Sequence, residues 1–218
     1  DNKQLINIYK KKKLKGNLNI ISNKNFKLIK IKIKNIYFET NINNQNLVFA
    51  YHLIKKLKIS DNTFINSMNT FKGLDHRYQI IYKNKFITCI NDSKATSFDA
   101  TKHALMNSKN IYWILGGLPK RGDIFNFKNF KKNIIRGYVI GRNINFYKKN
   151  LKKKIDFVIS KTLQKAIIQI CFSIKYDKKK NKVILFSPSA ASYDQYKNFE
   201  ERGDEFKKLI KLYARKYF

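Results

Sequence analysis

Cysteine is scarce in this sequence, which argues against a disulfide-rich secreted domain and against a cysteine-based metal site. The chain has two cysteines, Cys89 and Cys171, in 218 residues. They do not form the framework of a disulfide-rich secreted domain, and neither has the spacing of a metal-binding motif. Both lie inside apolar runs, so we expect them to be small core residues in a reducing compartment.

Long apolar segments are also missing. No run approaches the roughly 20 residues that a membrane-spanning helix needs. The first 15 residues are too rich in charge to resemble the apolar segment of a secretory signal peptide. We therefore expect a cytoplasmic protein that has no membrane partner.

Acidic residues are few: 14, against 47 lysines and arginines, which gives a formal net charge of +33. Such a balance often indicates a nucleic-acid or anionic-surface partner. Here the excess runs along the whole chain and is nearly all lysine, whereas arginine is favoured for bidentate contact with phosphate or guanine. We interpret most of the charge as a compositional background on solvated faces and expect no specific nucleic-acid partner. A basic anion-binding or nucleic-acid-binding module remains the alternative from another class.

The apolar pattern predicts two regions that differ in structure. In the first, residues 18–22, 26–33 and 35–40 are expected to form short strands, followed by helices over about 45–57 and 61–70. In the second, apolar runs alternate with helical patterns. This alternation predicts an α/β fold, a Rossmann-like, mostly parallel sheet with helices on both faces. The expected strands are FITCIN, IYWILGG, IIRGYVIG and VILFSP, and the expected helices cover about 97–107, 162–172 and 194–216.

Polar segments follow three of these strands, where a parallel sheet binds its ligands. They are NDSKAT (91–96), GGLPKRGD (116–123) and FSPSAASYDQYKNFEERGDEF (186–206), and FKGLDHR (71–77) joins the two regions. Each segment has a structural alternative. Ser93 or Thr96 is suited to capping a helix, a glycine pair commonly forms a turn, and Asp194 is suited to the start of the last helix.

Taken together, the order and spacing of these segments resemble the Mur ligase family. FKGL-x-HR, NDSKAT, GG-x-x-K and SP-x-x-AS-x-DQ-x-KNFE-x-RG-x-F match most closely its D-glutamate-adding branch. The resemblance covers about residues 45–218. It implies that residues 1–74 are the end of a central ATP-binding domain and that 75–218 form the C-terminal domain that binds D-glutamate.

The family resemblance also implies an activity and a set of site residues. Its members use ATP and Mg²⁺ to convert a carboxylate into an acyl phosphate, which the incoming amine attacks. The implied substrates are ATP, D-glutamate and UDP-N-acetylmuramoyl-L-alanine, a peptidoglycan precursor. Tyr193 departs from the family, which has a smaller apolar residue there. The implied residues are Lys94 as catalytic; Thr96, Lys120, Ser192, Tyr193 and Phe199 for D-glutamate; and Asn46, Arg77 and Asp92 for the nucleotide.

Some parts of such a ligase are missing from the sequence. It has no G-x-x-x-x-G-K-[ST] loop, no set of magnesium ligands and no UDP-binding domain, so we expect ATP and Mg²⁺ to be bound mainly by other regions. The chain alone is expected to be inactive. A fragment is the favoured explanation, because we expect the chain to begin inside a domain; a split subunit and a non-catalytic remnant are the alternatives. A ligase for another amino acid, or a folate-polyglutamylating relative, is disfavoured by the segment from Ser187 to Glu200.

Overall fold

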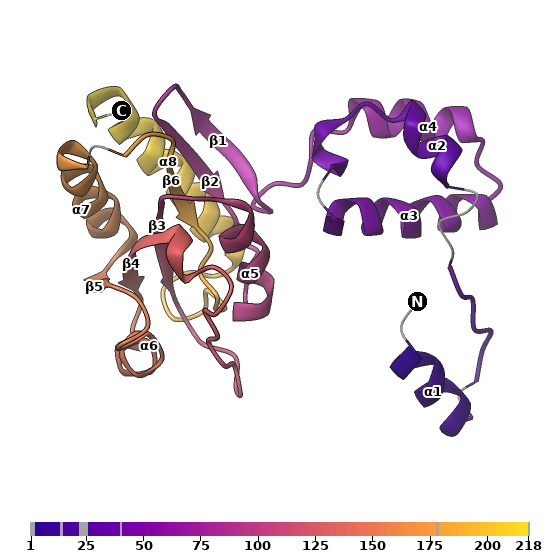
Figure 1. Ribbon diagram of the computed structural model, residues 1–218, viewed down its shortest axis with the longest axis horizontal. Helices are drawn as coiled ribbons and strands as arrows, with labels where there is room; N and C mark the ends of the chain where they lie inside the picture. The colour runs from indigo at the N-terminus through magenta and orange to yellow at the C-terminus, as the bar shows by residue number, and fades with distance from the viewer. Residues whose placement is uncertain (1–2, 14, 22–25, 40, 178, 218) are drawn as a thin grey trace. The chain divides into compact units, whose positions relative to one another are not determined.

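The computed structural model describes residues 3–13, 15–21, 26–39, 41–177 and 179–217 (Figure 1). The chain divides into two compact units, Asp1–Gly73 and Leu74–Phe218, here called unit one and unit two. Among the described residues, no helix combines the length and apolar character that crossing a membrane would require.

Unit one is helical where it is described. Its hydrophobic core joins residues from three of the helices and the short 3-10 segment, including Ile29, Phe38, Leu47 and Phe64. The predicted helix over 61–70 is confirmed, and it is capped by Ser60, whose Oγ accepts a hydrogen bond from the Thr63 N–H. The elements are α1 (Lys3–Lys11), α2 (Lys27–Lys32), η1 (Ile36–Phe38), α3 (Asn41–Lys56) and α4 (Asp61–Thr70).

The strands predicted in the first forty residues are wrong. Residues 26–33 contain α2 and residues 35–40 contain η1, while the described part of 18–22 has no regular structure; residues 22 and 40 lie outside the described residues. In FKLIKIKI the buried side chains are Phe26, Ile29 and Ile33, whereas Leu28 and Ile31 are exposed. Buried positions three and four residues apart follow a helical period, so the apparent strand alternation was misleading.

Unit two contains one six-stranded sheet with the strand order β1-β2-β6-β3-β4-β5. The β1–β2 pair is antiparallel and the other four pairs are parallel. The predicted class, a mostly parallel α/β sheet, is therefore confirmed. The strands are β1 (Gln79–Lys83), β2 (Ile87–Asn91), β3 (Ile111–Gly116), β4 (Ile134–Ile140), β5 (Phe157–Lys161) and β6 (Lys182–Phe186).

Helices cover both faces of this sheet, as Figure 1 shows. Alternate residues of β3 point to opposite faces: Tyr112 and Ile114 join the core under α7 and α8, and Trp113 and Leu115 join the core under α5 and α6. A 3-10 turn, η2 (Lys131–Asn133), precedes β4. The helices are α5 (Phe98–Asn107), α6 (Ile144–Leu151), α7 (Leu163–Tyr176) and α8 (Phe199–Tyr217).

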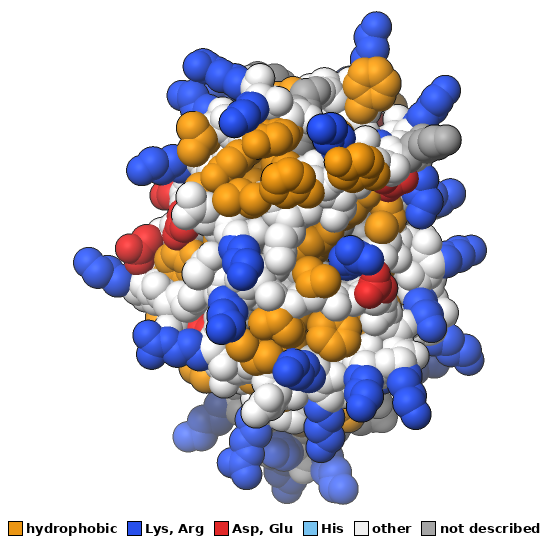
Figure 2. Space-filling view, turned by 90° about the vertical axis from the view of Figure 1, so that its left-hand side faces the viewer, with side chains coloured by type: hydrophobic (Ala, Val, Ile, Leu, Met, Phe, Trp, Pro, Cys, Tyr) orange, Lys and Arg blue, Asp and Glu red, His pale blue; other side chains and the backbone are white. Residues whose placement is uncertain are grey.

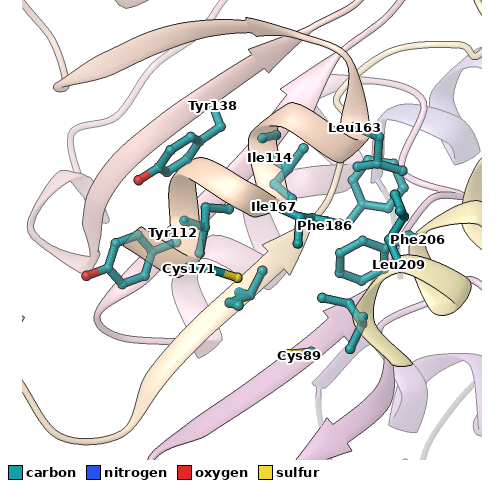
Figure 3. Close-up of a cluster of buried hydrophobic side chains, with 14 of the residues drawn as sticks. Cys89, Tyr112, Ile114, Tyr138, Leu163, Ile167, Cys171, Phe186, Phe206 and Leu209 are labelled. Carbon is teal, nitrogen blue, oxygen red and sulfur yellow. The ribbon is translucent and has the colours of Figure 1, made fainter. Parts of the chain in front are cut away.

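The core under α7 and α8 contains both cysteines (Figure 3). Cys89 lies on β2 and Cys171 on α7, and both are buried free thiols, as the sequence predicts. On the outside, Lys and Arg side chains are scattered over the face drawn in Figure 2 and do not gather into one patch.

Candidate functional site

Three loops meet at the carboxyl edge of the sheet, after β2, β3 and β6. The strand order places β6 between β2 and β3, so each loop lies beside another. Backbone hydrogen bonds then join them: the Asp92 N–H donates to the Phe186 carbonyl at 2.7 Å, and the Gly116 N–H donates to the Pro188 carbonyl at 2.9 Å. Leu118 and Ala191 exchange a further pair at 2.9 and 3.0 Å. The three polar segments expected at strand ends are thus brought together in one place.

The glycine pair after β3 makes the close approach of these loops possible. Gly116 and Gly117 have φ angles of +134° and +135°. A Cβ on Gly116 would lie 2.0 Å from the Ile140 carbonyl oxygen, and one on Gly117 would lie 2.3 Å from the Ala191 carbonyl oxygen. Only glycine fits at either position. The two glycines thus allow neighbouring backbone to approach closely.

Asp92 is buried and its carboxylate is occupied inside unit two. Its Oδ1 accepts from the Tyr78 N–H at 3.0 Å, and its Oδ2 accepts from the Ser187 hydroxyl at 2.7 Å. Desolvation raises the pKa of Asp92 to about 6, although both hydrogen bonds oppose the rise. Asp92 therefore links the loop before β1 to the loop after β6.

Asp92 is expected to make the stability of unit two depend on pH. Its folded pKa, about 6, lies above the ordinary 3.8, so the folded state binds more protons between these values and loses stability as pH rises through them. Two pKa units correspond to about 3 kcal/mol. Asp92→Asn cannot titrate, so its free energy of unfolding relative to wild type should be roughly 2–3 kcal/mol more favourable at pH 7 than at pH 4. Urea unfolding of both proteins at these pH values measures this; a pH-independent difference would show that Asp92 does not titrate there.

His76 and Arg77, from the segment between the units, lie in different surroundings. The His76 ring is buried, with its Nδ1 3.1 Å from the Asn91 Nδ2 and its Nε2 3.6 Å from the Asp204 Oδ1. Desolvation lowers the pKa of His76, with a smaller contribution from the positive charge of Lys207. The side chain of Arg77 is exposed. Of this pair, only Arg77 is accessible to a ligand.

Lys94 and Phe199, both predicted as site residues, meet in the structure. The Lys94 ammonium lies 3.7 Å from the centroid of the Phe199 ring, a cation–π geometry. A hydrogen bond joins the same two segments, because the hydroxyl of Ser93 donates to the Phe199 carbonyl at 2.8 Å. The loop after β2 is thereby fixed to the first turn of α8.

The other predicted glutamate residues lie on the three loops. Ser192 is buried, and its carbonyl accepts from the N–H groups of Gln195 and Tyr196. Thr96 and Lys120 are exposed, and Tyr193 is 71% exposed. Tyr193, one of the residues implied for D-glutamate, thus projects largely into solvent. Asn46, the remaining predicted nucleotide residue, is exposed on α3 and belongs to unit one.

Asp194 does not cap the last helix. The helix predicted from Asp194 begins at Phe199 instead, and the Asp194 Oδ2 accepts from the Arg142 N–H at 2.9 Å. Asp194 thus connects the loop after β6 to the loop after β4. The alternative interpretation as an N-cap is wrong because four further residues lie between Asp194 and the start of α8 at Phe199.

The sequence analysis missed a buried residue that connects two of the loops at this edge, Arg202. It is the fourth residue of α8, is 1% exposed, and donates hydrogen bonds to the loops after β2 and β6. The arginine of the segment FEERGDEF was part of the matched motif, but nothing local to it indicated burial. Its partners lie up to 109 residues earlier in the chain.

A magnesium ion has no set of protein ligands in the part of unit two that the structure describes. No group of three or more His, Cys, Asp or Glu residues placed to hold a metal occurs among the described residues. Asp92 is buried, and each of its carboxylate oxygens accepts a hydrogen bond from within unit two.

The fold and this edge define a class: a Rossmann-like α/β domain with three connected loops at the carboxyl edge of its sheet. The fold matches that of a UDP-N-acetylmuramate–alanine ligase from Thermotoga maritima, with a TM-score of 0.50 at 19% identity, over 80% of this chain and 38% of that chain. No family model matches the sequence.

Sequence relatives give a more particular answer. The chain is 34% identical over 168 residues to a protein of the Wolbachia endosymbiont of Brugia malayi, 37% over 164 residues to one of Rhizobium meliloti, and 36% over 172 residues to one of Rickettsia felis. All three are named UDP-N-acetylmuramoylalanine–D-glutamate ligase. The matches cover 77%, 75% and 79% of this chain but 34%, 35% and 38% of the relatives, so the chain spans about a third of their length. The resemblance to the Mur ligase family, and within it to the D-glutamate ligases, is confirmed.

Proposed function

We propose that this chain supplies the D-glutamate-binding part of an ATP-dependent ligase of peptidoglycan synthesis, which adds D-glutamate to UDP-N-acetylmuramoyl-L-alanine. The observation that carries the proposal is the meeting of the three predicted motif loops at one edge of the sheet. The identity of 34–37% to enzymes of that name supports the choice of substrate. In such a ligase ATP supplies the phosphoryl group of the acyl phosphate.

The residues at this edge are suited to an anionic amino acid. Lys120 follows the glycine pair on an exposed loop, and its ammonium offers charge-assisted hydrogen bonds to a carboxylate. Ser192 and Thr96 offer hydroxyls from the two neighbouring loops. Lys94 lies above the Phe199 ring, which restrains its side chain and keeps its charge at the edge of the site. We propose that Lys94 stabilises the negative charge that develops as the amine of D-glutamate attacks.

The proposed nucleotide contacts differ in their structural support. Arg77 is exposed and available for a phosphate or base. Asp92 is buried, and its oxygens accept hydrogen bonds from Tyr78 and Ser187. We therefore propose that it positions the loops of the site and does not contact the nucleotide. Asn46 and the rest of unit one are proposed as the end of the ATP-binding domain. The phosphate-binding loop would come from the remaining two thirds of the relatives' length, in the same polypeptide or in a second one.

Lys120→Ala is expected to weaken D-glutamate binding at least tenfold, because it leaves a ligand carboxylate without its cation; tenfold is about 1.4 kcal/mol. Calorimetric or NMR titration of the 218-residue chain with D-glutamate measures the change. Lys109→Ala is the matched control, since it removes the same charge from an exposed lysine at the opposite, amino end of β3. L-Glutamate tests stereospecificity. Equal affinity of wild type and Lys120→Ala would remove Lys120 from the site, and no binding by wild type would contradict the proposed function of the isolated chain.

A further inference from the structure

We propose that Arg202 is the positioning residue of this site: its buried guanidinium holds the loops of Lys94, Lys120 and Ser192 in one arrangement. The identity of the ligand in this inference rests on the proposed function. The holding of the loops does not, and it can be tested separately.

Arg202 bonds directly to two of the three loops. Its Nε donates to the Ser93 hydroxyl at 3.1 Å, and its Nη2 donates to the carbonyls of Ser93 at 2.8 Å and Ala190 at 3.0 Å. Ser93 immediately precedes Lys94, and Ala190 lies two residues before Ser192. A movement of the guanidinium therefore displaces both Lys94 and Ser192, because each is adjacent to, or one residue removed from, a residue that Arg202 bonds.

The third loop lies against the same guanidinium. A Cβ placed on Gly117 would be 3.2 Å from the Arg202 Nη1. Lys120 follows Gly117 by three residues. Contact with Arg202 thus restricts the start of the loop that carries Lys120, although no hydrogen bond joins them.

Arg202 also acts on the Lys94–Phe199 pair. The Ser93 hydroxyl accepts from Arg202 Nε and donates to the Phe199 carbonyl, so it is the middle of a short chain of hydrogen bonds. The Lys94 N–H donates to the His76 carbonyl at 2.9 Å, which fixes the other side of the residue. Loss of the arginine would free the Ser93 end of this arrangement.

The cost of this arrangement argues for a role beyond packing. Desolvation lowers the pKa of Arg202 to about 10, so the group stays protonated at neutral pH while buried. Its Nη1 makes no hydrogen bond within the described residues. A buried charge with an unsatisfied donor reduces stability, and apolar residues commonly fill such positions at no loss. What the guanidinium provides, and an apolar side chain cannot, is a fork of donors that bonds two loops at once.

Amide hydrogen exchange of the whole chain tests the holding of the loops. In Arg202→Met we expect the amides of Ala95, Leu118 and Ala191 to exchange at least tenfold faster, and the amides of Tyr138 and Val139 in β4 to change less than threefold. Arg202→Lys should fall between, because it keeps the charge but loses the fork. Arg215→Met, which removes an exposed arginine from the same helix, is the control and should change none of these rates.

Titration with D-glutamate completes the experiment. Arg202→Met should lower the affinity at least tenfold, with Arg202→Lys again between the two. Unchanged exchange in the three loops would overturn the inference, as would a uniform increase throughout unit two, which would mark a purely structural residue. If wild type binds no D-glutamate, the proposed function fails, and the exchange rates alone still decide whether Arg202 holds the loops.

Discussion

Gly116→Ala is expected to leave little folded unit two. The added Cβ would lie 2.0 Å from the carbonyl oxygen of Ile140 and 2.8 Å from its carbonyl carbon and nitrogen. Gly116 and Ile140 are paired at the ends of β3 and β4, so both groups in collision are backbone of the central sheet. Relief requires the two strands to separate. We expect a loss of more than about 4 kcal/mol, a large part of the stability of an ordinary domain.

Gly122→Ala is the matched control for this prediction. Gly122 lies in the same loop and also has a positive φ, +79°, but a Cβ there would meet no atom within 4 Å. Its substitution should cost only the backbone strain, about 1–2 kcal/mol. Urea unfolding of both variants separates strain from collision. If Gly116→Ala and Gly122→Ala lost similar amounts of stability, β3 and β4 would lie farther apart at Gly116 than the structure shows.

Phe98→Ala is expected to destabilise unit two by about 3–5 kcal/mol, the usual range for a buried phenylalanine. Phe98 is fully buried and stacks on Phe125 with a centroid distance of 4.2 Å; Phe127 and Phe130 lie 5.4 and 6.1 Å away. The cluster covers one face of the sheet and also holds the segment after Lys120. Its loss should therefore lower the melting temperature by roughly 10 °C.

Phe172→Ala provides the comparison for the aromatic cluster. Phe172 lies on α7 and is 57% exposed, so its removal should change stability by less than about 0.5 kcal/mol. Thermal unfolding followed by circular dichroism distinguishes the two variants. A small effect of Phe98→Ala would mean that neighbouring rings collapse into the space, and the cluster would then be less rigid than its ring contacts indicate.

The buried strands could be predicted because their apolar runs are continuous and bounded by polar residues. β3 is buried along its whole length, and β2 and β6 nearly so. The edge strands β1 and β5 were missed. Their side chains are mostly intermediate or exposed, so their sequences lack the contrast that marks a central strand.

The prediction for unit one failed for a different reason. FKLIKIKI alternates in its letters, and alternation is the strand signal, but only the positions at helical spacing became buried. In a segment of eight residues, the strand period of two and the helical period of 3.6 share most of their apolar positions. Tertiary packing against α3 and α4, which the local sequence does not report, decided between them.

For the candidate site, too, the local sequence predicted some features, whereas others depended on contacts with distant parts of the chain. Its general position followed from strand ends alone, since parallel strands bring their carboxyl ends to one edge. The central residue did not, because the burial of Arg202 depends on Ser93 and Ala190, and the sequence between them gives no hint of contact. The exposure of Tyr193 likewise depends on how the loop after β6 turns, which its residue types did not reveal.

The strand order has a consequence for the sequence of events in folding. β6 follows the other five described strands in the sequence, yet it lies between β2 and β3, so a nascent chain that has reached only residue 180 can form the β1–β2 hairpin and a separate β3–β4–β5 sheet but not the joined sheet. Each part then presents an unpaired edge until Lys182–Phe186 inserts between them. Domains with such long-range pairing fold slowly and expose edges that can aggregate. The proposed ligand site can therefore form only after Lys182–Phe186 has been synthesised, because the strand that closes the sheet also brings the loops of Lys94 and Lys120 together.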